Sequence, residues 1–268
     1  MRILLYGSNG LLGKEFIKMN NEKRKYEIFQ GKNNITEQVI FWEIENYKPD
    51  IIINFAGLVK YKIDYAVSIF YSNVLGPINL SRQAMLFNQE YDKKVKVITI
   101  GSTCDNDIDS NIYSYSKKCL TGLVNHLSIL KIIRLPGIFA NSRKSGAIYN
   151  FYQKAVDNEK IIIDSKLDKW NCLYLESAIE TIYENLDYIT MSKISNIAYD
   201  ELHNLKVVAT IIKKYLKSKS KIIVNRQPLE SKISSAKGIL SNDQIWIFPK
   251  NKLKKDLKLY VEKNLYNS

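Results

Sequence analysis

The chain has 268 residues and a mass of 31.1 kDa, with 46% hydrophobic and 25% charged residues, a composition typical of a soluble globular protein with a large core. No linker-like stretch divides it. No apolar run reaches the length of a membrane span, and no signal-peptide region precedes the first strand, so we expect a cytoplasmic protein without a membrane partner.

The net charge of +13 comes from 40 Lys and Arg against 27 Asp and Glu, dispersed along the chain. The densest basic run, 213–221, lies at the end of an expected helix, where cations meet the negative end of the dipole. No nucleic-acid motif accompanies the charge, so we expect no nucleic-acid partner. The cysteines, Cys104, Cys119 and Cys172, have neither the number nor the spacing of a disulfide framework or a metal site, which predicts reduced thiols and no metal.

A glycine-rich turn follows the first strand. The apolar residues 3–6 run into Gly7, Gly10 and Gly13, and Phe16 continues the segment at helical spacing. In this context the first glycine permits a tight turn, the second lets a pyrophosphate approach the backbone, and the third lets the helix pack on its strand. The N–H groups that begin the helix then face the phosphates, so the turn predicts a dinucleotide site.

Strands and helices alternate over the next hundred residues. We predict strands at 25–31, 51–57, 94–102 and 130–136, and helices at 36–47, 66–90 and 114–128. Thr36 is expected to cap the first of these helices. Continuous apolar strands joined by crossovers of helix length indicate a parallel sheet that is buried on both faces.

Beyond Pro136 the alternation is looser. We predict helices at 145–157, 176–186, 203–216 and 250–265, and strands at 161–164, 171–175, 194–198 and 221–224. The fold class is therefore α/β: a Rossmann-type doubly wound parallel sheet in 1–140, and a smaller C-terminal α/β substrate lobe in 141–268, with some segments returning to the main sheet. Ligands of such a sheet lie at the carboxyl ends of its strands.

A phenol and an ammonium group share one helix face, because Tyr113 and Lys117 are four residues apart. A nearby lysine stabilises phenolate, so we expect the pKa of Tyr113 to fall and the phenol to exchange protons near neutral pH. Tyr215 and Lys219 have the same spacing in a lysine-rich helix end. Only Tyr113 follows a buried strand that ends in hydroxyl residues, Ser102 and Thr103.

Six segments in this order resemble the extended short-chain dehydrogenase/reductase family, in its branch of nucleotide-sugar epimerases, dehydratases and 4-ketoreductases. They are GSNGLLG (7–13), KPDIIINFAG (48–57), SNVLGPINL (72–80), ITIGST (98–103), YSYSK (113–117) and IIRLPGIFA (132–140). The resemblance covers about the first 140 residues well and continues weakly through 171–182 and 194–198.

The resemblance implies a role for each matching residue. Tyr113 would be the acid/base, Ser102 or Thr103 would bind the reacting oxygen, and Lys117 would assist Tyr113 and bind the nicotinamide ribose. The residues assigned to the cofactor are Gly7, Asn9, Gly10, Leu11, Gly13, Gln30, Lys32, Asn34, Ile35, Ala56, Gly57, Asn73, Tyr113, Lys117 and Pro136.

The chain also departs from the family pattern. Thr103 and Tyr113 are only ten positions apart, so the loop between them is shorter than the one that extended members usually carry. Cys104 and Asp105 follow the hydroxyl pair, where dehydratases place Asp and Glu. The stretch GSTC resembles GDP-fucose synthases, whose cysteine works with a histidine, but neither His126 nor His203 lies where that histidine is expected.

Gln30 and Lys32 stand where NAD-binding members carry an acid, which favours NADP(H) over NAD(H). Binding of the substrate's diphosphate requires cationic side chains, such as the planar guanidinium of arginine, which forms paired hydrogen bonds to phosphate oxygens. The candidate substrate-binding residues are Cys104, Arg143, Arg226 and Lys237.

The leading hypothesis is an NADP(H)-dependent reductase of a 4-keto-6-deoxyhexose nucleotide, which the resemblance connects with surface-polysaccharide synthesis. It also implies a nucleotide-diphosphate-sugar partner and a homodimer that includes the Tyr113 helix. Two alternatives remain: an NAD-dependent nucleotide-sugar 4-epimerase with the same residues, and a non-enzymatic dinucleotide-binding regulator in which the pairing of Tyr113 with Lys117 is accidental.

Overall fold

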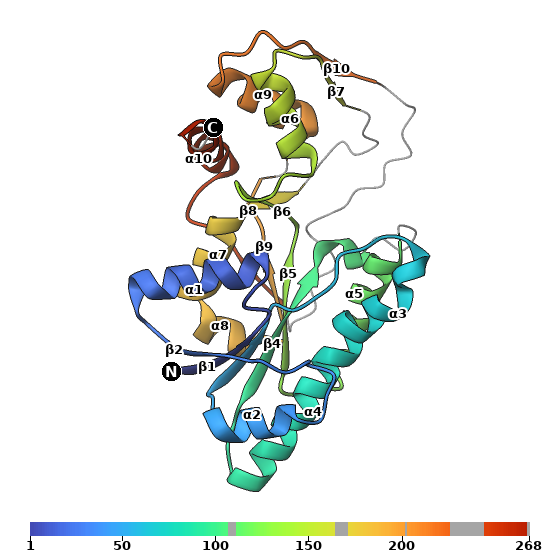
Figure 1. Cartoon of the computed structure of the whole chain (residues 1–268), viewed down its shortest axis with the longest axis vertical. Coiled ribbons are helices and arrows are strands. Elements are labelled where there is room, and N and C mark those ends of the chain that lie inside the picture. Colours follow the sequence, from blue (N-terminus) through green and yellow to red (C-terminus); the bar gives the residue numbers. More distant parts are fainter. Residues whose placement is uncertain (107–110, 164–170, 202, 226–243, 267–268) are drawn as a thin grey trace. The chain divides into compact units, whose positions relative to one another are not determined.

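The computed structural model describes residues 1–106, 111–163, 171–201, 203–225 and 244–266 (Figure 1). The chain divides into two compact units. The first comprises Met1–Leu135, Ile182–Ile197 and Ile239–Ile247, and the second comprises Pro136–Thr181, Ala198–Gly238 and Phe248–Ser268. Among the described residues, no helix is long and apolar enough to cross a membrane.

The first unit is built on a seven-stranded parallel sheet, which confirms the expected doubly wound architecture. From edge to edge its strands are β11 (Gln244–Ile247), β9 (Ile194–Ile197), β5 (Leu130–Leu135), β4 (Lys96–Ser102), β3 (Ile51–Asn54), β1 (Arg2–Tyr6) and β2 (Glu27–Gln30). The strand order reverses beside β1, which pairs with β2 on one side and β3 on the other. That reversal opens a crevice at the carboxyl ends of β1 and β3.

Helices cover both faces of this sheet (Figure 1). On one face lie α2 (Ile40–Tyr47), α4 (Gly76–Tyr91) and α5 (Ile112–Leu123), whose apolar side chains pack on the even-numbered positions of β1 and β3, such as Leu4 and Ile52. On the other lie α1 (Leu11–Lys23) and α8 (Leu186–Met191). Phe16 of α1 packs its ring 5.6 Å from Phe55. Burial on both faces explains why the strands are continuously apolar.

The helix predicted at 66–90 is helical throughout but not regular. After a 3₁₀ turn at Ile63–Tyr65, α3 (Ala66–Phe70) passes through a π turn, η2 (Tyr71–Leu75), into α4. The predicted cap is wrong: Thr36 does not cap α2. That helix begins at Ile40, after turns and a bend at 35–39, and the Thr36 hydroxyl donates to Asn34 Oδ1 over 3.0 Å.

The described residues of the second unit form two short parallel pairs and three longer helices. β6 (Gly137–Phe139) pairs with β8 (Cys172–Tyr174), and β7 (Ile161–Ile163) pairs with β10 (Ile222–Val224). The helices are α6 (Ala147–Val156), α9 (Leu205–Tyr215) and α10 (Leu253–Tyr266), while α7 (Leu175–Glu184) runs from this unit into the first. Phe139, Tyr152, Tyr174 and Tyr260 form an aromatic core with ring centroids 5.2–5.8 Å apart.

Candidate active site

The glycine turn after β1 has the close packing that a dinucleotide cradle requires. Gly7 has φ +76°, and a Cβ there would lie 2.3 Å from Ala56 N. A Cβ on Gly13 would lie 2.3 Å from the Gly7 carbonyl oxygen. No side chain caps the N-terminus of α1 at Gly10, so its first N–H groups can face a ligand. Asn9 and Leu11 flank Gly10, with Asn9 exposed and Leu11 half-buried.

The turn after β2 is held by a buried carboxylate. Glu43 of α2 accepts hydrogen bonds from the Tyr6 hydroxyl over 2.6 Å and from the backbone N–H groups of Lys32 and Asn33 over 2.9 and 3.3 Å. The Tyr6 ring lies so close to Gly31 that a Cβ there would approach it to 2.2 Å. The side chains of Gln30 and Lys32 remain exposed at the end of this strand.

A hollow of about 480 Å³ lies between this turn, the end of β3 and α3. Its lining includes Asn34, Ile35 and Ala56, three of the residues assigned to the cofactor. Tyr71 and Ser72 of the π turn also line it. The volume is in the range of cofactor pockets, and the hollow adjoins the glycine cradle through Ala56.

Asn73 links the end of β3 to α5. Its Oδ1 accepts from the Leu58 N–H over 2.8 Å, and its Nδ2 donates to the Leu58 carbonyl over 2.9 Å and to Ser116 Oγ over 3.2 Å. The side chain is 1% exposed. A Cβ on Gly57 would lie 3.2 Å from Asn73 Oδ1 and 3.9 Å from Lys117 Nζ, so the loop after β3 passes close to the ammonium group.

Tyr113 and Lys117 lie on α5, with Lys117 Nζ 5.8 Å from the centre of the Tyr113 ring. The ammonium donates to the Ile100 carbonyl of β4 over 2.7 Å. Burial lowers the pKa of Lys117 to about 8, although the neighbouring Cys104 and Asp105 oppose the shift. The expected fall of the Tyr113 pKa is wrong for this chain: burial first, and then Cys104, raise it, and a side-chain hydrogen bond from Ser102 offsets only part of the effect.

Ser102, rather than Thr103, is the hydroxyl that interacts with the tyrosine. Ser102 is the last residue of β4 and is buried, and its side chain acts directly on the pKa of Tyr113. Its Oγ also lies 2.9 Å from Cys104 Sγ. Thr103 begins the 3₁₀ turn η3 (Thr103–Asn106), which carries Cys104 beside the pair. The described residues of the first unit thus bring a phenol, an ammonium, a hydroxyl and a thiol together at the end of β4.

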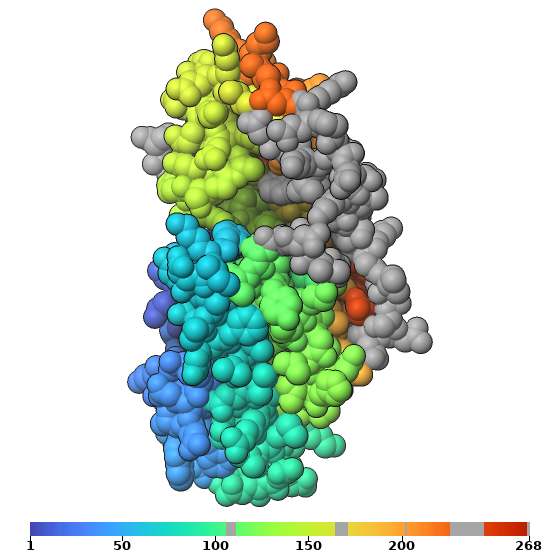
Figure 2. All heavy atoms as spheres, turned by 90° about the vertical axis from the view of Figure 1, so that its right-hand side faces the viewer, coloured from blue at the N-terminus to red at the C-terminus, as the bar shows by residue number. Residues whose placement is uncertain are grey.

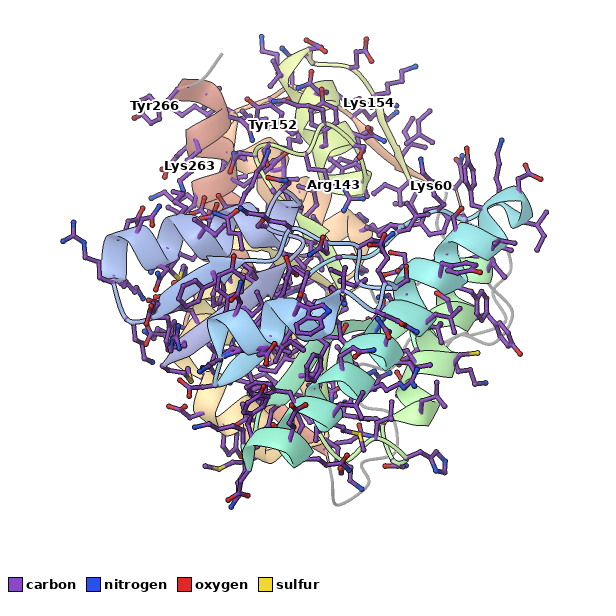
Figure 3. All side chains as sticks on the ribbon, turned by 60° about the horizontal axis from the view of Figure 1, so that its bottom comes forward. Lys60, Arg143, Tyr152, Lys154, Lys263 and Tyr266 are labelled. Atoms are coloured by element: carbon purple, nitrogen blue, oxygen red, sulfur yellow. The ribbon has the colours of Figure 1, made fainter. Side chains whose placement is uncertain are left out.

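The other candidates do not belong to the described residues of the first unit. Pro136 and Arg143 belong to the second unit, and Arg143, in the segment after β6 (Figure 3), donates to the Ile138 carbonyl over 2.8 Å. Arg226 and Lys237 lie outside the described residues. Local spacing in the sequence does not reveal that Arg134 forms a buried ion pair with Asp105 behind the site, because the two residues are 29 positions apart.

No family model matches the chain. One curated relative, GDP-6-deoxy-D-talose 4-dehydrogenase of Aggregatibacter actinomycetemcomitans, is 27% identical over 143 residues, covering 47% of this chain. The match spans about half (48%) of that enzyme's length.

Solved structures resemble the whole chain. A dTDP-4-dehydrorhamnose reductase from Clostridium acetobutylicum has a TM-score of 0.75 at 15% identity, with 100% of both chains covered. The enzyme of the same name from Bacillus anthracis, in complex with NADP, has a TM-score of 0.74 at 16% identity, with 98% of each covered. UDP-glucose 4-epimerase of Thermotoga maritima, with UDP-glucose, has a TM-score of 0.73 at 13% identity, covering 100% of this chain and 99% of that one. At these identities the comparison establishes the fold, which the chain shares with nucleotide-sugar reductases and epimerases.

Proposed function

We propose that the chain is an NADP(H)-dependent oxidoreductase that reduces the 4-keto group of a 4-keto-6-deoxyhexose attached to a nucleoside diphosphate. The observation that carries the proposal is the gathering of Ser102, Tyr113 and Lys117 at the end of β4, at the same sheet edge as the glycine cradle after β1. The shared fold and the partial match to a 6-deoxytalose nucleotide dehydrogenase support the substrate class.

The residues present fit a dinucleotide. A side chain at Gly7 or Gly13 would collide with neighbouring backbone, so only glycine permits the tight turn that a pyrophosphate can approach. The hollow beside Asn34, Ile35 and Ala56 would receive the adenosine end. Asn73 would hold the loop after β3 against it. When bound, the nicotinamide would supply the hydride.

The proton for the new hydroxyl would come from Tyr113. A raised pKa keeps the phenol protonated at neutral pH, which is the state that a proton donor requires. The Ser102 hydroxyl would orient the carbonyl oxygen toward the phenol. The ammonium of Lys117 would stabilise the phenolate that remains after transfer, because it is protonated below a pKa of about 8.

Replacing Tyr113 by Phe tests this assignment. With a panel of nucleotide-linked 4-ketosugars, we expect kcat to fall by about 10² to 10⁴, while the Kd for NADPH, measured by fluorescence titration, changes little. Tyr115→Phe is the matched control, because Tyr115 is exposed on the same helix. Wild-type turnover by Tyr113→Phe would contradict the role. Interconversion of sugars without loss of NADPH absorbance would indicate a 4-epimerase, and binding of NADPH with no turnover of any sugar would favour the non-enzymatic regulator.

The preference for NADP(H) would reside at the end of β2. Gln30 presents no charge to repel a 2′-phosphate, the Lys32 ammonium is exposed, and the nearby Glu43 carboxylate is occupied by Tyr6 and two backbone N–H groups. We expect NADPH to bind more tightly than NADH. Lys32→Glu should weaken NADPH binding by about tenfold or more without weakening NADH, and Lys94→Glu, an exposed control, should change neither. Tighter binding of NADH by the wild-type chain would contradict this preference.

We also propose that the chain forms a homodimer through the face that contains α5, with a nucleotide-diphosphate sugar as its substrate. Exposed apolar side chains on α3, the π turn and α5 support this arrangement.

A further inference from the structure

A network of four polar side chains lies directly behind the candidate active site. Asp105, Arg134 and Asn196 are 4%, 5% and 0% exposed, and Thr121 is half-buried on α5. These residues come from η3, β5, β9 and α5, all in the first unit. None of them was assigned a role by the motifs in the sequence.

Arg134 is the centre of the network. Its Nη2 forms an ion pair with Asp105 Oδ1, its Nη1 donates to Asn196 Oδ1 over 3.2 Å, and its Nε donates to the Ser102 carbonyl over 3.4 Å. A buried ion pair stabilises little by itself, because desolvation offsets the attraction of the charges. Its placement is informative, since the guanidinium binds the backbone of the residue whose hydroxyl acts on Tyr113.

Asp105 continues the network toward Lys117. The Thr121 hydroxyl lies 2.7 Å from Asp105 Oδ2 and 3.0 Å from the Lys117 carbonyl oxygen, one turn earlier on α5. Asp105 therefore connects η3 both to β5 and to the helix that carries Tyr113 and Lys117. The Asp105 carboxylate is thus linked to the backbone of Ser102 through Arg134, and to the backbone of Lys117 through Thr121.

The charge of Asp105 also acts on the ammonium. Lys117 lies close to Cys104 and Asp105 of η3 and to Tyr113 of its own helix, with Arg134 of β5 behind Asp105. Tyr61, from the loop after β3, packs its ring 6.0 Å from that of Tyr113. Cys104 and Asp105 hold up the pKa of Lys117 against burial. Loss of the Asp105 charge would lower the pKa values of both Lys117 and Tyr113, because the carboxylate raises both.

We propose that Asp105 and Arg134 are positioning residues for the reduction: the pair sets Ser102 against Tyr113 and, through Thr121, holds the helix that carries Lys117. The inference rests on the proposed function, in which the active chain needs both Tyr113 and Lys117 protonated. A purely structural role would affect folding alone.

The main test is Asp105→Asn, which keeps the side-chain shape and removes the charge. Where kcat is measured below the melting temperature, we expect it to fall by about 10- to 100-fold, with a smaller change in KM. The alkaline limb of the pH–rate profile should move to lower pH, since Lys117 and Tyr113 both lose their protons more readily without the Asp105 charge. Asp256→Asn is the matched control: Asp256 is a buried carboxylate of the second unit that accepts from Tyr199, so its loss should reduce stability without moving this limb.

Two further variants separate positioning from folding. The double variant Asp105→Asn/Arg134→Met removes the guanidinium that Asp105→Asn leaves without its carboxylate partner, so its stability should recover in part relative to Asp105→Asn. The alkaline limb of its pH–rate profile should stay at lower pH than that of the wild type. Thr121→Val should lower kcat by a few-fold, on the order of a lost hydrogen bond, whereas Thr210→Val, which removes a similar hydroxyl-to-carbonyl bond on α9, should leave it unchanged. Recovery of the wild-type limb in the double variant, or unchanged kcat in both Asp105→Asn and Thr121→Val, would overturn the proposal.

A binding measurement distinguishes this failure from that of the proposed function. Lys117 should bind the cofactor ribose in its charged form, so the Kd for NADPH should rise with pH as Lys117 deprotonates. We expect the midpoint of this rise to lie at lower pH in Asp105→Asn, whichever sugar is the substrate. A wild-type midpoint in Asp105→Asn would overturn the inference even if Tyr113→Phe abolishes turnover; a shifted midpoint in a chain that reduces no sugar would instead contradict the proposed reaction.

Discussion

Lys117 carries an ammonium group into the interior of the first unit, where only 5% of its surface is exposed. Its pKa is lowered from 10.5 to about 8 by burial, so the charged form is destabilised in the folded chain. The hydrogen bond that its ammonium donates to the Ile100 carbonyl compensates only in part. A residue that costs stability at its own site is typical of functional positions.

This cost can be measured with Lys117→Met. Between pH 8 and about 10, Lys117 of the unfolded chain retains a proton that the folded chain has lost, which contributes a rise of the unfolding free energy with pH. Buried Cys172, whose pKa is raised, contributes an opposite slope to wild type and variant alike, so the measured quantity is the difference between the two chains. The variant should lack the Lys117 contribution and be more stable at pH 7 by about 1–3 kcal/mol. Above about pH 10 the tyrosines of the unfolded chain lose protons that buried Tyr6 and Tyr199 keep in the folded chain, because burial raises their pKa values. This lowers the unfolding free energy with pH, so the comparison is limited to pH values below about 10. Chemical denaturation across this range is the measurement.

Lys118→Met provides the control, because Lys118 is exposed on the same helix and should change the slope little. A Lys117→Met variant that is less stable than the wild type at pH 7, or that keeps the wild-type slope, would contradict this account of the buried ammonium.

At the scale of elements, the turn between β1 and α1 depends on the absence of side chains. Gly7→Ala places a Cβ against the Ala56 backbone at a positive φ, so we expect a loss of about 1–3 kcal/mol in unfolding free energy and strongly weakened NADPH binding. Gly122→Ala is the control: no atom lies within 4 Å of its Cβ position in α5, and the helix should gain about 0.5–1 kcal/mol. Thermal unfolding and fluorescence titration would show both effects; undiminished NADPH binding by Gly7→Ala would exclude the turn as the cradle.

The π turn at Tyr71–Leu75 is an element that periodicity could not reveal. The apolar spacing of 66–90 indicates one helix, and the structure is helical throughout, but the extra residue per turn at 71–75 changes where the buried side chains point. Asn73 lies in this turn and thereby reaches both Leu58 and Ser116. Such turns concentrate at functional sites, in agreement with its place beside the candidate cofactor hollow.

At the scale of the whole molecule, the surface of α3, the π turn and α5 is the relevant feature. These elements lie side by side on the face shown in Figure 2, and Val67, Tyr71, Leu75 and Tyr115 are 70%, 54%, 46% and 57% exposed. Phe70 and Tyr115 place their rings 6.1 Å apart across the two helices. A cluster of exposed apolar side chains on adjacent helices is typical of an interface between protein chains.

We therefore expect a dimer in analytical ultracentrifugation. Tyr115→Glu should shift it toward monomer by introducing a charge at the expected centre of the contact. Tyr188→Glu, at an exposed side chain of α8, should leave the assembly unchanged. A monomeric wild type, or equal dissociation in both variants, would contradict an interface that includes α5.

The sequence by itself determined the sheet, the glycine turn and the shared helix face of Tyr113 and Lys117, because each depends on local spacing: runs of apolar residues, glycines at fixed intervals, and a four-residue separation on a helix. It also predicted β9 as a strand. It did not predict β11, β6 or α8, which are short and owe their place to neighbours distant in the chain.

Only the tertiary structure decided the rest of the candidate site. Which hydroxyl faces Tyr113, the direction of its pKa shift, the reach of Asn73 and the pairing of Asp105 with Arg134 all depend on side chains from separate elements. The partial burial that raises the pKa of Tyr113 comes from side chains of separate elements packed around it, and no spacing along the chain expresses it. Local periodicity therefore specifies the elements and the candidate residues, whereas packing between distant segments sets their electrostatics and their mutual geometry.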